Sequence, residues 1–173
     1  MLPSYQELMK PVLEAAKNEE VKLSNVIDLL AEQFNLSEDE RTELLPSGRQ
    51  AAFTNRVGWA KTYLAKAGLL DSVRRGHFVI TDLGKEALNS GEEIDNQYLK
   101  RFDDFNAFTK RKNGDSDKTE DTNVPDNDAT PDEVLRAAYK QINDALASDI
   151  LSRTRKISPA FFEQLLIDLL LAM

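Results

Sequence analysis

Apolar residues recur at helical spacing along the first forty-five residues of the chain, and the turn residues between them divide this pattern into three predicted helices. Pro11 suits the first turn of one helix, and Ser24 is the expected cap of the next. Ser37 with Glu40 three positions later predicts a capping box, and the short helix that it opens is expected to end at Leu45.

The longest regular stretch in the first half predicts a helix from Ala51 to about Ala67, ended by Gly68. Its apolar stripe is expected to face the core: Phe53, Val57, Ala60 and Leu64. Alternation then replaces the helical period between residues 73 and 80, around a turn at Arg75 and Gly76, which predicts a two-stranded hairpin. Thr81 opens a further helix. This order predicts a mainly α fold with a small β-hairpin, that of a winged helix-turn-helix domain.

A composition shift divides the chain. Residues 113–130 hold six acids, one lysine and almost nothing apolar, which predicts a disordered acidic linker. It separates a domain at residues 1–90 and a helical extension at residues 91–112 from two helices in residues 131–173. Thr130-Pro131 and Ser158-Pro159 are the expected starts of these two helices, and Glu133 three positions after Thr130 predicts a capping box at the first of them.

The last predicted helix is apolar nearly all round, a pattern typical of helices inside a larger core. Two interpretations remain open. Residues 131–173 pair between copies in a homo-oligomer, or the final helix opens a domain whose remainder lies outside the sequence.

Charge is unevenly distributed. The net charge is −8, yet residues 41–85 hold eight basic and three acidic side chains, a local +5. A basic island of this kind is typical of a nucleic-acid footprint. The start of the chain lacks a secretory pattern and the apolar end is too short to span a bilayer, so we expect a cytoplasmic protein.

Candidate DNA-binding residues lie on the long predicted helix, at its amino end and at the hairpin turn. Side-chain amides and arginine can bond base edges, and arginines at a wing can reach phosphates. Trp59 can stack on a base or pack against a neighbouring helix. The set is Arg49, Gln50, Asn55, Trp59, Thr62, Lys66, Arg74 and Arg75.

The chain has no cysteine and one histidine, His77, which we interpret as an ordinary strand residue. No catalytic or metal-binding residue is therefore predicted. The candidate DNA-binding residues favour a double-stranded DNA-binding module. Two alternatives remain: a transcription regulator of the same fold, or a protein-interaction domain, with residues 131–173 as an oligomerisation arm.

Several motifs in order resemble the Mrr family of restriction endonucleases directed at methylated DNA. They are "PSYQEL" at 3–8, "LLPSGRQ" at 44–50, "NRVGWAKTYLAKAGLL" at 55–70 and "RRGHFVITDLG" at 74–84. This resemblance implies a winged-helix domain that binds double-stranded DNA, including methylated DNA.

A second stretch, "ISPAFFEQLLIDLLLAM" at 157–173, resembles the opening helix of that family's PD-(D/E)XK nuclease domain. The resemblance implies magnesium-dependent catalysis by residues that would follow position 173. Glu163 matches a glutamate of the opening helix, and we expect it to be structural here. The chain is thus expected to be a truncated form, inactive by itself.

Overall fold

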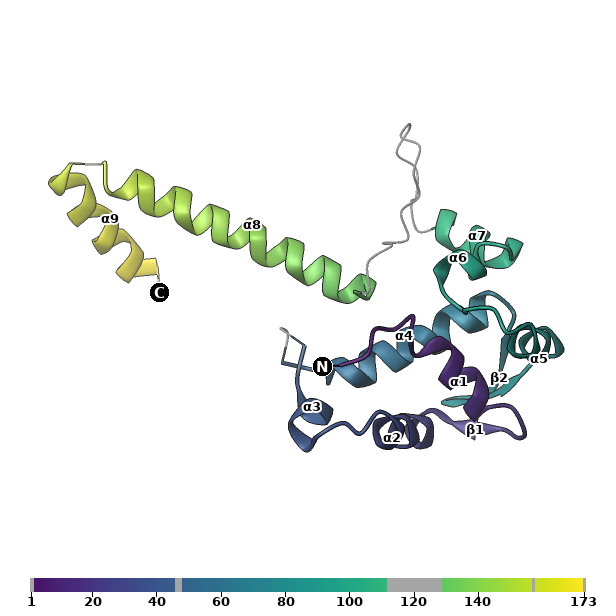
Figure 1. Ribbon diagram of the computed structural model, residues 1–173. Helices are drawn as coiled ribbons and strands as arrows, with labels where there is room; N and C mark the ends of the chain where they lie inside the picture. Colours follow the sequence, from purple (N-terminus) through teal and green to yellow (C-terminus); the bar gives the residue numbers. More distant parts are fainter. Residues whose placement is uncertain (1, 46–47, 112–128, 157, 173) are drawn as a thin grey trace. The chain divides into compact units, whose positions relative to one another are not determined.

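The structure is a computed structural model that describes residues 2–45, 48–111, 129–156 and 158–172. It contains two compact units, residues 1–133 and residues 134–173 (Figure 1). The elements of the first unit follow in chain order: α1 (Met9–Ala15), β1 (Val21–Lys22), α2 (Leu23–Gln33), α3 (Glu38–Thr42), α4 (Ala52–Lys66), β2 (Leu70–Arg74), β3 (His77–Ile80), α5 (Asp82–Asn89), α6 (Asn96–Leu99) and α7 (Asp103–Arg111). Then α8 (Pro131–Thr154) begins in the first unit and continues into the second, which also holds α9 (Pro159–Ala172).

The strands form one antiparallel sheet in the order β1-β3-β2. The predicted hairpin is confirmed as β2 and β3, with Gly76 at a φ of 75° in the turn, a conformation that glycine adopts without steric cost. Phe78 and Ile80 of β3 alternate into the core as expected. The prediction of two strands was incomplete, because β1 adds a third through its Val21 opposite Phe78. Two residues are too few to show an alternating pattern in the sequence.

The core of the first unit lies between α4 and the elements around it, and α1, α2 and α3 all pack against this helix. The predicted stripe on α4 is confirmed, since its four residues are at most 1% exposed: Phe53, Val57, Ala60 and Leu64. Because the apolar stripe of α4 is buried, the opposite surface of this helix faces solvent. Half of the predicted site residues line that surface.

Two predicted boundaries were wrong. The helix α2 begins at Leu23 after Lys22, without a side-chain cap, and the Ser24 hydroxyl instead donates to Asn25 Oδ1. The capping box of Ser37 is present, but α3 ends at Thr42. The chain beyond it turns back to start α4, and the Leu45 amide donates to the Gln50 carbonyl at 2.9 Å.

An aromatic cluster joins α7 to α4. The Tyr63 ring meets those of Tyr5, Trp59 and Phe105 edge to face, each with centroids 5.5 Å apart. Burial, with a smaller contribution from Tyr5, raises the pKa of the Tyr63 phenol far above its usual range, so the ring stays neutral. The segment after α5 is therefore packed onto the α4 helix within the first unit.

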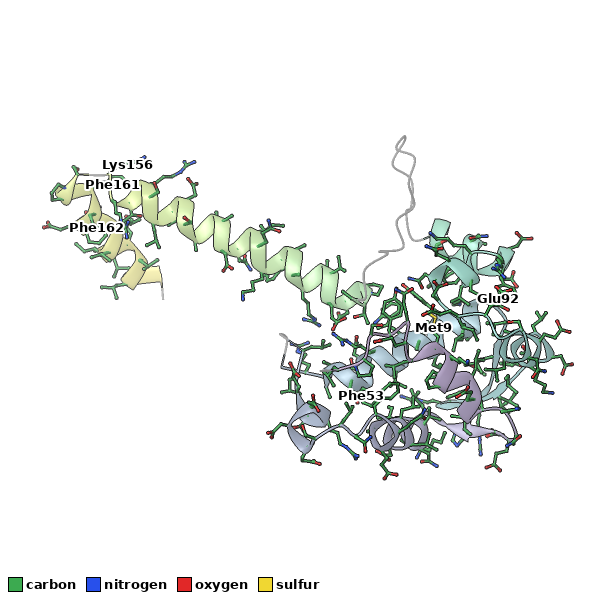
Figure 2. The ribbon with its side chains drawn as sticks, viewed as in Figure 1. Met9, Phe53, Glu92, Lys156, Phe161 and Phe162 are labelled. Atoms are coloured by element: carbon green, nitrogen blue, oxygen red, sulfur yellow. The ribbon has the colours of Figure 1, made fainter. Side chains whose placement is uncertain are left out.

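The second unit consists of helix with little burial. Apolar residues follow one side of α8, and α9 is apolar nearly all round, yet their large side chains are exposed: Leu135, Tyr139, Ile142, Leu146, Phe161, Leu166, Leu170 and Leu171 are among them. Figure 2 marks Met9 and Phe53 among the packed side chains of the first unit, and Phe161 and Phe162 on α9. Within the described ranges, no helix has the length and apolar character needed to cross a membrane.

Candidate nucleic-acid interface

A shallow depression of about 310 Å³ lies on the side of α4 that faces away from the core. It is lined by Leu23, Gln50, Asn55, Gly58, Trp59, Lys61 and Thr62. Gly58 explains why the surface is hollow here, because a Cβ at this position would meet no atom within 4 Å. Four of the eight predicted site residues therefore share one surface.

The polar wall of the depression is formed by two amides. The Asn55 Nδ2 donates to Gln50 Oε1 at 3.1 Å. The expectation that Asn55 lies exposed on the outer face was wrong: its side chain is 8% exposed, because residues near the start of α8 cover it. Gln50, one turn before it, is exposed.

The opposite wall is formed mainly by apolar groups. Trp59 is half-buried, with its ring edge-to-face against Tyr63. The Thr62 hydroxyl donates to the Gly58 carbonyl at 2.8 Å, so this side chain is held against its own helix. The depression thus offers an aromatic ring, a methyl-bearing side chain and an outward amide, a combination that fits the edge of a planar, partly polar ligand such as a base.

Lys66, Arg49, Arg74 and Arg75 lie outside the depression. The Lys66 ammonium lies 5.3 Å from the Phe108 ring on α7, where a cation–π contact holds it. Arg49 is exposed just before α4. At the hairpin, Arg74 pairs with Glu20 at 2.8 Å, and Arg75 is exposed at the turn beside Gly76.

Sequence reasoning missed Lys61 as a site residue, although it lies three positions after Gly58 and helical spacing could have placed it there. Its ammonium donates to Ser72 Oγ at 3.2 Å and so connects α4 with β2 of the hairpin. One cation therefore lies between the depression and the wing.

A second group that no local pattern could reveal lies behind the depression. The Arg56 guanidinium donates to Glu133 at 3.0 Å and to the carbonyls of Leu2 and Pro3. The Thr130 hydroxyl donates to Asn55 Oδ1 at 3.0 Å. Because 75 and 77 residues separate these partners, the chain must fold before the pairs exist. The capping box predicted for Thr130 is confirmed, since Glu133 accepts from its amide at 2.7 Å.

The described residues contain no group of three or more histidine, cysteine, aspartate or glutamate side chains that could hold a metal ion. The magnesium implied by the family resemblance therefore has no ligand set in the described ranges. His77 Nδ1 contacts the Arg75 carbonyl at 3.1 Å, and because a carbonyl can only accept, Nδ1 carries the proton. Glu163 is exposed on α9.

Three features define the class of protein. Helices α1 and α2 pack against α4, a three-stranded sheet follows the β1-β3-β2 order, and the β2–β3 turn forms a wing beside α4. This arrangement is a winged helix-turn-helix domain, in which α4 occupies the position of a recognition helix.

Comparison with known proteins agrees with this class. Residues 5–90 match the model of the Mrr N-terminal domain, and the chain belongs to the Mrr family. A relative from Escherichia coli (strain K12), the type IV methyl-directed restriction enzyme EcoKMrr, is 30% identical over 179 aligned positions. The alignment covers 98% of this chain and 58% of that enzyme, so the chain spans little more than half of its length. No solved structure matches the chain significantly.

Proposed function

We propose that the first unit is a double-stranded DNA-binding module of an Mrr-type restriction system. The observation that carries the proposal is the depression on α4 beside the β2–β3 turn, in a domain of the Mrr N-terminal type. The amino-terminal part of α4 with Gln50 lies in the major groove, while Arg74 and Arg75 contact phosphates or the minor groove.

The charges of this surface support the proposal. Arg49, Arg75 and Lys61 lie along α4 and the wing, within the stretch of local charge +5, and the rest of the chain carries −13, which gives the net charge of −8. Arg74 remains available despite Glu20, because a solvent-exposed ion pair contributes at most about 1 kcal/mol and exchanges readily for a phosphate. Non-specific affinity for the duplex would come mainly from these cations.

Recognition of modified DNA is a finer proposal. The E. coli relative is described as methyl-directed. The hollow at Gly58, flanked by the Trp59 ring, offers an apolar surface at which a base methyl group would lose contact with water. In a restriction system, this module would place a magnesium-dependent nuclease on modified sites.

The second unit supports a proposal about assembly. Leu135, Tyr139, Ile142 and Leu146 of α8 follow each other at spacings of four, three and four, as in the seam of a coiled coil, and each is more than half exposed. We propose that residues 131–173 pair between copies of the chain. Sedimentation across protein concentrations tests this proposal, and a monomer at all concentrations would contradict it.

The DNA proposal is tested by fluorescence anisotropy with short duplexes, methylated and unmethylated, over a salt series. For each phosphate neutralised, the logarithm of the affinity should fall by roughly 0.9 per unit of log salt. We expect Arg74→Glu with Arg75→Glu to weaken binding to all duplexes alike. The slope of log affinity against log salt should become shallower by the contribution of about two phosphate contacts.

The matched control is Lys10→Glu with Lys17→Glu at the exposed surface of α1 and just after it, which changes the net charge by the same amount. It should alter binding far less than the wing variant. Equal effects of the two pairs would show that only net charge matters and that the wing is not in contact. No binding at low salt would reject the proposal in favour of a protein-interaction domain.

A further inference from the structure

A chain of three hydrogen bonds connects the start of α8 with the amino end of α4, all within the first unit. The Glu133 amide donates to Thr130 Oγ1 at 3.3 Å, the Thr130 hydroxyl donates to Asn55 Oδ1 at 3.0 Å, and Asn55 Nδ2 donates to Gln50 Oε1 at 3.1 Å. Thr130 is fully buried and Asn55 nearly so. The last member, Gln50, reaches solvent in the depression.

The direction of this series of hydrogen bonds follows from the atoms that face each other. A backbone N–H can only donate, so the Thr130 oxygen accepts from Glu133. The single hydroxyl proton of Thr130 is directed to Asn55, whose facing atom is the oxygen. The two ends of an amide are opposite in character, so the nitrogen of Asn55 faces Gln50, and the facing atom of Gln50 must be its own oxygen.

We infer that Asn55 is a positioning residue that turns the amide of Gln50 so that its Nε2 donor faces the ligand. This inference rests on the proposed DNA-binding function. Among the described residues, Gln50 makes no other side-chain hydrogen bond. The surface therefore presents two N–H donors at the amino end of α4 and prefers a hydrogen-bond acceptor on a base edge.

The fixed orientation of the Gln50 amide changes which base Gln50 is expected to recognise. A glutamine amide that can turn freely suits adenine, which offers one donor and one acceptor in the major groove. With the Gln50 oxygen engaged by Asn55, the best complement is an edge with acceptors only, the O6 and N7 of guanine, whereas the N4 donor of cytosine opposes it. Asn55 itself reads no base, because both ends of its amide are occupied inside the protein.

The sharpest test reverses the direction of these hydrogen bonds between Thr130, Asn55 and Gln50. In Asn55→Asp the carboxylate accepts from Thr130 and from Gln50, so the Gln50 amide must turn its nitrogen inward and its oxygen outward. Base preference is measured by selection from a pool of duplexes with randomised sequence. We expect the wild-type protein to favour guanine at one position by roughly three- to tenfold, the effect of one neutral hydrogen bond. Gln50→Ala should remove this preference.

In Asn55→Asp the same position should shift toward a base with a donor, cytosine or adenine. Because a buried carboxylate can disturb folding, Thr130→Val is the second variant: without the hydroxyl, Asn55 can adopt either orientation, and the preference should fall toward that of Gln50→Ala. Thr130→Ser keeps the hydroxyl and should keep the wild-type preference. A variant that only weakened the fold would lower affinity for all duplexes without changing which base is favoured.

A readout without DNA follows from the same geometry. The Gln50 side-chain NH2 signals should exchange rapidly with water in the wild-type protein and become protected in Asn55→Asp, where they are donated to the carboxylate. Wild-type preference retained in both Asn55→Asp and Thr130→Val, or no base preference in the wild-type protein, would overturn the inference while DNA binding stands. Absence of any DNA binding by the wild-type protein would instead reject the proposed function itself.

Discussion

The two units of this chain treat their apolar residues in opposite ways. In the first unit, α4 carries one apolar stripe, and every member of it is buried under neighbouring elements. In the second unit, α9 is apolar around most of its circumference, and Leu170 is 71% exposed. Both segments form regular helices, so helix formation and burial are separable. Local helix propensity is enough to form a helix, whereas a buried core requires a complementary surface on a neighbouring element.

The largest test of this contrast compares one phenylalanine from each unit. Phe53→Ala empties a site in the core, where Phe53 is 1% exposed, and should lower the free energy of unfolding by about 3–5 kcal/mol. Phe161→Ala removes the same atoms from α9, where the side chain is 58% exposed, and should leave the unfolding of the first unit unchanged. Urea denaturation followed by circular dichroism provides the measurement. Similar losses in both variants would mean that α9 is packed as a core helix.

Substitutions at two glycines of the first unit should change stability by an intermediate amount. In Gly84→Ala the new Cβ would collide with the Leu69 carbonyl and lie 2.7 Å from Ile80 Cγ1, so α5 must move off the sheet at a cost of about 1–3 kcal/mol. Gly58→Ala adds the same methyl group to open space inside α4 and should stabilise the domain by roughly 0.5–1 kcal/mol. Thermal melts of the two variants should therefore shift in opposite directions. A destabilised Gly58→Ala would contradict the open surface of the depression.

The smallest expected change in stability separates the start of α8, which belongs to the first unit, from the rest of that helix. Glu133→Gln keeps a side chain suited to a capping box but neutralises the half-buried partner of Arg56, and should cost roughly 1 kcal/mol. Asp149→Asn breaks the exposed pair with Arg153 further along α8 and should cost less than about 0.5 kcal/mol. Urea midpoints at low and high salt measure both. If the two variants were equal, the start of α8 would not be anchored to the first unit.

Local signals predicted much of the fold. The capping boxes at Ser37 and Thr130, the turn at Gly76 and the core stripe of α4 are each encoded within a few residues, and each is present in the structure. The order of elements was then sufficient to predict the winged-helix class. The strand β1 was missed because it is defined by its partner β3 and not by its own two residues.

The candidate site could be predicted only in part. Helical spacing brought Trp59 and Thr62 to one face, as the depression requires, and Gln50 was expected at the amino end of the same helix. It also placed Asn55 on that face, because spacing alone cannot reveal a cover that arrives from residue 130. The Arg56–Glu133 pair has the same origin, and it removes one cation from the basic island counted in the sequence. The roles of the predicted site residues in DNA binding remain predictions.

Trp59 gives the molecule an optical property of its own. It is the sole indole in the chain, it lies at the rim of the depression, and its ring is 5.5 Å from the Tyr63 phenol, close enough to receive excitation energy from it. Light absorbed by the buried aromatic cluster would thus be emitted from the rim of the depression. If DNA binds there as proposed, the unlabelled protein carries its own fluorophore for following the binding.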